Sequence, residues 1–461
     1  MIRILLYPSI AYPSKEINLF DRSYIQFLSL FIHFMLKKRQ DIFWYIITPI
    51  NKGRRKDELN EIKSKLNFNN TRLINIDIPK NPFNRIHFNI HDIKRELKLN
   101  EYSIDFIFCH QPEIAKQLKL FFKTDTIYNP PIIGYIHLFE LPKIDWEDVF
   151  EFNIFGISEM DICFVNTTYQ KQMIHEEARK IFSSSVCGGL HEKIKVLPPV
   201  VIPKNINQNG TGRYEKIIIW NHEVNKRKNF IDFVNTIMLL RKQRDDFKVW
   251  FPMMKSSHKL TREYRWIVCG GAENRKIFLE NLRKCCVGVS PKTIYGEWKK
   301  ATIEGNANGI PYLMYDEEYY RNINNDGDFF KTRKDLILLL NKYLSKQDYR
   351  NKMAGKAIGN LITKHDLKRK VDAISKEINN IQKNKQSNRT KITNKIVTLI
   401  KSHKKISLKE LLGKKYLNWD YLMKFDAYRK TILNTKGITE DGINSKSKKY
   451  EWKSLYKYIR T

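Results

Sequence analysis

Short apolar runs alternate with amphipathic segments along most of this sequence, and the alternation stops once and then starts again. The first series lies within residues 1–203 and the second within residues 204–382. The polar stretch Pro203–Gly212 contains two glycines, as linkers often do, and separates the two series. Short apolar runs that alternate with helical patterns predict parallel strands joined by helices. Two series therefore predict two doubly wound α/β domains.

The expected strands fall into two sets. The first set is Ile2–Tyr7, Ile42–Thr48, Arg72–Ile78, Ile104–Cys109, Ile132–Leu138, Asp161–Asn166 and Lys193–Val201. The second set is Ile217–Trp220, Phe247–Phe251, Trp266–Cys269, Val287–Ser290 and Tyr312–Tyr315. Helical patterns at Asp335–Leu344 and Gln347–Ile378 are expected to close the second domain.

The charge balance restricts the kind of partner. The 461 residues include 83 Lys and Arg but only 49 Asp and Glu, which gives a net charge of +34 at pH 7. Such an excess favours a polyanionic partner, either nucleic acid or an acidic membrane surface. A Lys-rich proteome would give the same bias without any such partner, because Asn, Ile and Lys are all abundant here.

The cysteines and the N-terminus predict a soluble, cytoplasmic protein, in the host cytoplasm if the chain is viral. None of the six cysteines has the C-x-x-C spacing of a zinc site, and four lie in apolar runs, as reduced core cysteines do. Residues 1–8 lack the features of a signal peptide. The most apolar helical pattern, Tyr24–Leu36, is too short to cross a bilayer, so no integral membrane association is expected.

One segment of the second series carries the clearest sign of chemistry. Ser290-Pro-Lys292 follows an apolar run, and a polar loop then leads into a short helical pattern that contains Glu304. Gly309-Ile-Pro311 ends this helix, and a further apolar run starts at Tyr312. A carboxylate at a helix start beyond the carboxyl end of a parallel strand lies where open α/β sheets bind ligands. We therefore expect Glu304 in a ligand site.

This segment resembles the donor-sugar loop of GT-B glycosyltransferases of the family-4 type. The resemblance covers roughly residues 1–380 and implies two Rossmann-like domains that face a cleft. It also implies a nucleotide-sugar donor, with UDP-glucose as the first expectation, and no required metal. Glu304 matches the family's second acid, which would bind the ribose hydroxyls. Glu297, one residue later than the family pattern, is the nearest match to the first acid, which would contact the sugar. A solvated acid near a helix start is the alternative for Glu304.

A second segment, Ile217–Phe230, resembles the loop of this family that binds the donor diphosphate. Lys228 matches the phosphate-binding lysine, and Asn229 matches the start of the next helix, where free backbone N–H groups favour an anion. The family's arginine position holds an acid in this chain, so we expect Lys226 or Arg227 to substitute for it. A basic surface turn is the alternative.

The end of the fifth expected strand gives the candidate catalytic residues. Family members have a His there, often followed by an acid, which faces the transferred sugar across the cleft. His137 matches, but the acid is displaced to Glu140. The resemblance implies that His137 faces the sugar and that Glu140 is an acid or base on the acceptor side. A single His at a strand end can equally be structural.

The C-terminal residues, which we expect to form a domain over 390–461, have a pattern of their own. Helical periodicity at 393–401, 407–413 and 418–433 precedes a turn, and a strand is expected at Tyr450–Leu455. The order helix, helix, helix, wing resembles a winged helix-turn-helix module. Residues 385–461 contain 20 Lys and Arg against 6 Asp and Glu, a net charge of +14. This density favours double-stranded DNA as the partner.

The residues expected to contact DNA lie on the third helix and on the wing. They are Lys424, Arg429, Lys430, Lys446, Lys448 and Lys449. A helix of this kind enters the major groove, where cations neutralise phosphates. A basic helical cap that packs on the enzyme or on another protein is the alternative.

Three functions remain open from the sequence. The first is a retaining glycosyltransferase that moves a hexose, with glucose as the expected sugar, to a modified base in DNA, similar in plan to the DNA glucosyltransferases of phages. The second is a glycosyltransferase of surface polysaccharide or lipid acceptors at an anionic membrane. The third is a non-catalytic DNA-binding protein whose core senses a sugar nucleotide. A winged helix favours the first over the second, and donor hydrolysis would separate the first from the third.

Overall fold

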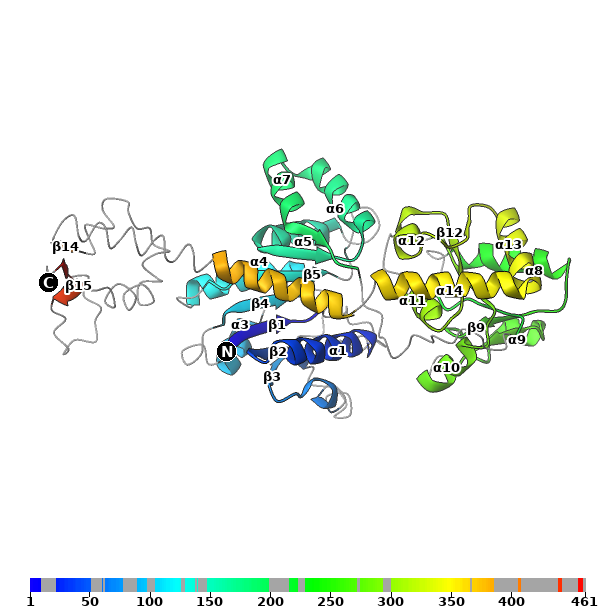
Figure 1. The fold of residues 1–461 in the computed structure, drawn as a ribbon, viewed down its shortest axis with the longest axis horizontal. Coiled ribbons are helices and arrows are strands. Elements are labelled where there is room, and N and C mark those ends of the chain that lie inside the picture. Colours follow the sequence, from blue (N-terminus) through cyan, green and yellow to red (C-terminus); the bar gives the residue numbers. More distant parts are fainter. Residues whose placement is uncertain are drawn as a thin grey trace.

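The two predicted α/β domains are present in the computed structural model (Figure 1). They lie side by side along the long axis, and a small third sheet lies beyond the first domain. The structure describes residues 1–9, 22–50, 60, 63–77, 89–97, 104–125, 129–136, 139, 147–198, 215–222, 229–271, 274–292, 300–364, 367–384, 405–407, 438–441 and 455–458.

The first series of strands forms one seven-stranded sheet in which all pairs are parallel. The strands are β1 (Ile2–Tyr7), β2 (Ile42–Ile50), β3 (Thr71–Asp77), β4 (Phe106–Cys109), β5 (Ile132–Ile136), β6 (Ile162–Val165) and β7 (Ile194–Val196). Their order is β3-β2-β1-β4-β5-β6-β7, so the winding direction reverses between β1 and β4. This is the predicted doubly wound arrangement, and all seven predicted strands are present.

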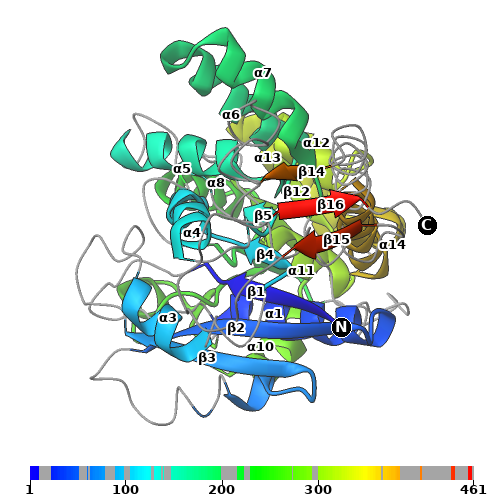
Figure 2. The same ribbon diagram turned by 90° about the vertical axis from the view of Figure 1, so that its left-hand side faces the viewer.

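Helices cover both faces of this sheet (Figure 2). They are α1 (Arg22–Lys38), α3 (Ile90–Leu97), α4 (Pro112–Asp125), α5 (Glu147–Glu159), α6 (Thr168–Ile181) and α7 (Ser184–Lys193). Alternate strand residues enter two separate cores, because side chains of a strand point to opposite faces. One core packs β1 residues Leu5 and Tyr7 against α4 and α5, and the other packs Ile4 and Leu6 against α1.

The second series forms a six-stranded parallel sheet of order β10-β9-β8-β11-β12-β13. The strands are β8 (Ile217–Ile219), β9 (Lys248–Phe251), β10 (Ile267–Cys269), β11 (Val287–Ser290), β12 (Tyr312–Tyr315) and β13 (Phe329–Phe330). The helices are α8 (Phe230–Arg241), α9 (Lys259–Glu263), α10 (Arg275–Leu282), α11 (Lys300–Ala307), α12 (Glu318–Ile323), α13 (Arg333–Ser345) and α14 (Gln347–Lys364). The predicted strands are all present, and β13 is an addition.

The long helix predicted at the end of the second domain is two helices. After α14, residues 367–384 form another helix, which packs on the first sheet. Its apolar side chains Leu367, Val371 and Ile374 belong to the same core as α1. After α14 the chain therefore returns from the second domain to the first. The two domains are linked by the chain itself, and the helix of residues 367–384 packs on the first domain.

Some elements carried no clear signal in the sequence. Helix α7 contains Gly188 and Gly189, which weaken a helical pattern, and a side chain at either glycine would meet no atom within 4 Å. Strand β13 has two residues, too few for a periodic pattern. Among the described residues, no helix is long and apolar enough to span a membrane. All six cysteines are free and buried.

A small antiparallel sheet lies near the C-terminus. It contains β14 (Lys405–Ser407), β15 (Ile438–Asp441) and β16 (Leu455–Tyr458), in the order β14-β16-β15. Strand β16 begins where the predicted strand Tyr450–Leu455 ends. The three predicted helices of this part lie largely outside the described residues.

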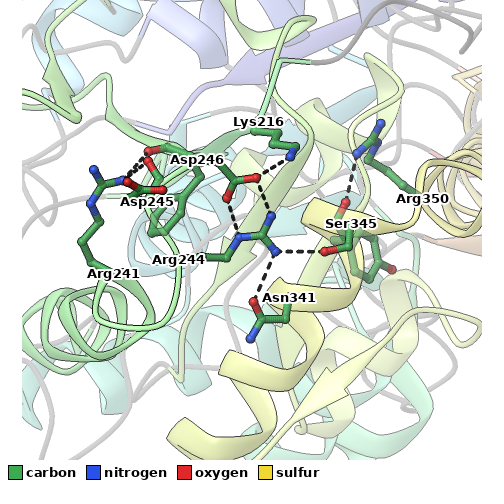
Figure 3. Close-up of polar contacts among 10 residues, drawn as sticks. Lys216, Arg241, Arg244, Asp245, Asp246, Asn341, Ser345 and Arg350 are labelled. Atoms are coloured by element: carbon green, nitrogen blue, oxygen red, sulfur yellow. Dashed lines mark hydrogen bonds and ion pairs between the residues drawn. The ribbon is translucent and has the colours of Figure 1, made fainter.

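An ion-pair network holds the amino-terminal edge of the second sheet (Figure 3). Arg244 donates two hydrogen bonds to Asp246, of 2.7 and 2.8 Å, and Lys216 also donates to this carboxylate. The same guanidinium contacts Ser345 of α13 at 3.0 Å. The hydrogen bonds from Arg244, and next those from Lys216, lower the pKa of Asp246 from its usual value.

We predict that Asp246 stabilises the protein at neutral pH and that this contribution is lost in acid. Because its pKa is lower in the folded than in the unfolded protein, its stabilisation is complete above about pH 4 and fades below it. Asp246→Asn should therefore lower the free energy of unfolding at pH 7 by about 1 kcal/mol or less, as exposed ion pairs do. The difference from wild type should shrink at pH 3 in urea denaturation.

Asp245→Asn is the matched control, because Arg241 bonds the backbone oxygen of Asp245. An equal effect of both substitutions, or a D246N effect that does not depend on pH, would contradict the assignment.

We also predict opposite effects for two alanine substitutions of helical glycines. An added Cβ at Gly305 would lie 2.0 Å from the ring of Tyr312, whereas at Gly359 it would meet no atom within 4 Å. Gly305→Ala should destabilise by about 1–3 kcal/mol through overpacking. Gly359→Ala should stabilise by about 0.5–1 kcal/mol through helix propensity. Urea denaturation measures both, and a stabilising G305A would refute the close packing.

Candidate functional site

The two segments singled out in the sequence meet at the carboxyl end of the second sheet. Strand β8 pairs with β11, with Val287 opposite Ile218 and Gly288 opposite Ile219. The strand order reverses between these two neighbours, because β9 and β10 lie on one side and β12 and β13 on the other. A crevice outside the carboxyl ends at such a reversal is where open α/β sheets bind ligands.

Asn221 connects the end of β8 to the start of α11. The hydroxyl of Tyr312 donates to Asn221 Oδ1 at 2.8 Å, and Asn221 Nδ2 donates to the backbone oxygen of Ala301 at 3.2 Å. Both side chains are buried. Burial raises the pKa of Tyr312 well above its usual value, so its hydroxyl stays a neutral donor. These bonds fix α11 relative to the sheet edge.

Two glycines allow α11 to lie close to the sheet. A Cβ at Gly288 of β11 or at Gly305 of α11 would lie within 2.3 Å of the Tyr312 ring. The hydroxyl groups of Ser290 and Thr302 are 2.6 Å apart and buried, which joins the end of β11 to the first turn of α11. The helix that carries Glu304 is therefore positioned by tight packing.

Glu304 lies in the second turn of α11, the helix that follows β11, and not at the helix start where the sequence placed it. Its carboxylate forms an ion pair with Arg275 of α10, and the side chain is 14% exposed. Arg275 itself is 49% exposed and lies over the ring of Phe278 at 5.4 Å. The carboxylate is thus close to the surface and already held by a cation.

Asn229 begins α8 in an unusual backbone conformation. Its φ of 51° and ψ of 36° are left-handed, which Asn tolerates better than most residues, and its side chain does not cap the helix. A hydrogen bond from a capping side chain would normally satisfy an N–H group of the first turn. The side chain of Asn229 therefore leaves the N–H groups at the start of α8 to other partners, and such groups suit an anionic ligand.

Residues of both segments line a cavity of about 170 Å³. Trp220 and Asn229 line it from the first segment, and Pro291 and Lys292 line it from the second. Its remaining lining residues come from α8, from strand ends and from the start of α13: Asp232, Phe233, Thr236, Val289, Tyr315, Phe330, Lys331, Thr332, Arg333 and Leu336. Glu304 does not line this cavity, so the structure brings Asn229, but not Glu304, to it.

Most of the predicted site residues lie outside the described residues. These are His137, Glu140, Lys226, Arg227, Lys228, Glu297, Lys424, Arg429, Lys430, Lys446, Lys448 and Lys449. Their roles remain predictions. His110, which directly follows β4, is 2% exposed and packs against the rings of Phe108 and Tyr135.

Sequence reasoning missed Asn221 and Arg275. Asn221 follows a strand directly, like the predicted ligand residues, but its partner Tyr312 is 91 residues away in the chain. Arg275 is 29 residues from Glu304, and neither position has a periodicity that would link them. In the described part of the chain, no group of three or more His, Cys, Asp or Glu side chains could hold a metal ion.

No protein-family model and no curated protein matches this sequence. Solved structures do match. The crystal structure of Anabaena Alr3699/HepE in complex with UDP-glucose has a TM-score of 0.57 and 10% identity, over 82% of this chain and all of that one. Trehalose-6-phosphate synthase OtsA has a TM-score of 0.57 and 11% identity, over 82% of this chain and 99% of that one.

The α,α-trehalose-phosphate synthase (UDP-forming) of Burkholderia vietnamiensis has a TM-score of 0.58 and 11% identity, over 83% of this chain and 100% of that one. Identities this low establish the fold alone. The agreement extends over both domains, because it covers 82–83% of this chain and nearly the whole length of each of these proteins. Together with the two parallel sheets, it shows that this chain has the two-domain GT-B fold.

Proposed function

We propose that this protein is a nucleotide-sugar-dependent glycosyltransferase that moves a hexose, with retention, to a modified base in double-stranded DNA. The observation that carries the enzyme proposal is the position of Glu304 on α11, whose first turn is joined to the carboxyl end of β11 by Ser290 and Thr302. The solved structures with this fold include complexes with UDP and with UDP-glucose. UDP-glucose is therefore the first donor to test.

In the proposed donor site, Glu304 accepts hydrogen bonds from the ribose hydroxyls. The start of α8 at Asn229, with Lys228 and either Lys226 or Arg227, binds the diphosphate. Glu297 contacts the sugar. The basic side chains and the N–H groups at the start of α8 would offset the negative charge of the leaving diphosphate, so the proposal needs no metal ion for that step.

On the acceptor side we propose His137 and Glu140. They follow β5, whose last residue Ile136 ends at the carboxyl edge of the first sheet. A residue there can face a donor held at the corresponding edge of the second sheet. His137 would contact the transferred sugar, and Glu140 would exchange a proton with the acceptor hydroxyl.

The proposal of a DNA acceptor rests on the C-terminal residues. The net charge of +14 over residues 385–461 favours a polyanion. Strands β15 and β16 are antiparallel, with Asp441 opposite Leu455, and we propose that the segment between them serves as the wing. Lys446, Lys448 and Lys449 belong to this connection. A target base must be reached in a groove or flipped out, which a DNA-holding module would assist. We propose that the protein acts in the cytoplasm.

One assay separates the proposed acceptors. The protein is incubated with radiolabelled UDP-glucose and with hydroxymethylated duplex DNA, unmodified duplex DNA or lipid vesicles. We expect label in hydroxymethylated DNA. Label in lipid alone would refute the DNA acceptor and favour a membrane glycosyltransferase. Donor binding without transfer or hydrolysis would favour a sugar-nucleotide sensor.

We predict that Glu304→Gln weakens the binding of UDP-glucose by about 10- to 100-fold, because hydrogen bonds to a charged group are worth about 1.5–3 kcal/mol. Isothermal titration calorimetry measures this directly. Glu280→Gln, which changes an exposed acid of the neighbouring helix α10, is the matched control and should bind like wild type. If E304Q binds UDP-glucose normally, Glu304 is not a donor residue.

We also predict that removal of residues 385–461 lowers the affinity for duplex DNA and the steepness of its salt dependence. UDP-glucose binding should stay unchanged, because the helix of residues 367–384 packs on the first domain through its own apolar side chains. Fluorescence anisotropy with labelled DNA at several salt concentrations measures both quantities. Unchanged DNA affinity would remove the proposed role of this segment.

A further inference from the structure

The outward face of the last two long helices is strongly basic. Helix α14 and the helix of residues 367–384 follow one another along the same side of the molecule, from the second domain to the first (Figure 1). Their exposed cationic residues are Lys352, Lys356, Lys368, Arg369, Lys376 and Lys383. This face leads directly into the basic residues 385–461.

The spacing of these cations keeps them on one face. In the second helix, Arg369, Lys376 and Lys383 recur every seven residues, which places them in line and roughly 10 Å apart. The opposite side of this helix carries the core residues Leu367, Val371, Ile374 and Ile378. Lys370 is the exception, because it lies on the core side, where burial lowers its pKa well below the usual value.

The acids of the second helix do not neutralise this face. Asp372 forms an ion pair with Lys38 of α1, and Glu377 pairs with Lys195 at 2.7 Å, so both are paired with the first domain. Lys376 and Lys383, by contrast, have no ion-pair or hydrogen-bond partner among the described residues. The outward charge is therefore available to a partner.

The exposed face of α14 carries two glycines and little apolar surface. Gly355 and Gly359 are exposed, and a side chain at either would meet no atom within 4 Å. They lie beside Lys352 and Lys356 and leave bare backbone between the lysine side chains. Ile362, at 44% exposure, is the large exposed apolar residue of this helix. A phosphate backbone can approach such a surface closely.

We propose that this face, named here the closing-helix face and formed by Lys352, Lys356, Arg369, Lys376 and Lys383, binds the sugar-phosphate backbone of double-stranded DNA. The proposal rests on the proposed DNA acceptor and adds a contact surface on the enzyme core. Charge complementarity favours DNA, because each neutralised phosphate releases counterions. A membrane is less suitable, since interfacial helices insert a broad apolar face, and this face has one exposed large apolar residue.

The test compares two quadruple variants of the full-length protein. One removes four charges from the closing-helix face, K356Q/R369Q/K376Q/K383Q. The control removes four exposed charges from the far part of the second domain, K248Q/K259Q/R262Q/K276Q. Both have the same net charge. Binding to labelled duplex DNA is measured by anisotropy over a range of salt concentrations, with vesicles containing phosphatidylserine as a second ligand.

We expect the closing-helix variant to bind DNA at least tenfold more weakly at about 0.1 M salt. The slope of log K against log salt should fall by up to about 3.6, since each of the four phosphate contacts contributes about 0.9. The control should change both quantities much less, and UDP-glucose binding should be normal in both. Equal losses in the two variants, or loss of vesicle binding alone, would overturn the proposal. If the wild-type protein transfers sugar to DNA but the closing-helix variant binds DNA normally, the closing-helix face does not bind DNA, and the proposed function is unaffected. If wild type binds no DNA, both proposals fail.

Discussion

The close contact between the ring of Tyr312 and two glycines is the constraint on which the second domain's site depends. Gly288 and Gly305 leave room for this ring between β11, β12 and α11, and no larger residue fits at either position. Tyr312 then donates its hydrogen bond to Asn221, which in turn holds the start of α11. A buried hydrogen bond of this kind is costly to break, because it leaves Asn221 unsatisfied. Through this chain of contacts the sheet edge determines where Glu304 lies.

The ion pair between Arg275 and Glu304 gives the site its electrostatic character. In the proposed donor site the carboxylate would lie near the nucleotide diphosphate, where an unpaired negative charge would repel the ligand. Arg275 offsets that charge, and its half-exposed guanidinium remains within reach of solvent. A nearby cavity is lined by Lys292 and by Asn229 at the start of α8, which are further groups suited to anions.

The two α/β sheets could be predicted from the sequence because each of their strands, apart from the two-residue β13, is marked by a local run of apolar residues. Helices α3, α5, α7, α9 and α12 were not predicted. The motif around Glu304 correctly predicted a short helix between β11 and β12, although Glu304 lies in its second turn. Contacts between distant residues, such as Asn221 with Tyr312 and Arg275 with Glu304, have no periodic signature and could not be predicted. The return of residues 367–384 to the first domain was missed for the same reason, since an apolar stripe does not specify its partner.

The central claim is that a nucleotide sugar binds at the carboxyl edge of the second sheet. Hydrogen–deuterium exchange with and without UDP-glucose tests it most directly. The account predicts slower exchange on ligand addition at the start of α8, near Asn229, and in α11 around Glu304, because both helices would contact the bound nucleotide. It also predicts little change at the amino-terminal edge of the same sheet, near Asp246. No protection at either helix, or protection confined to other parts of the chain, would contradict it.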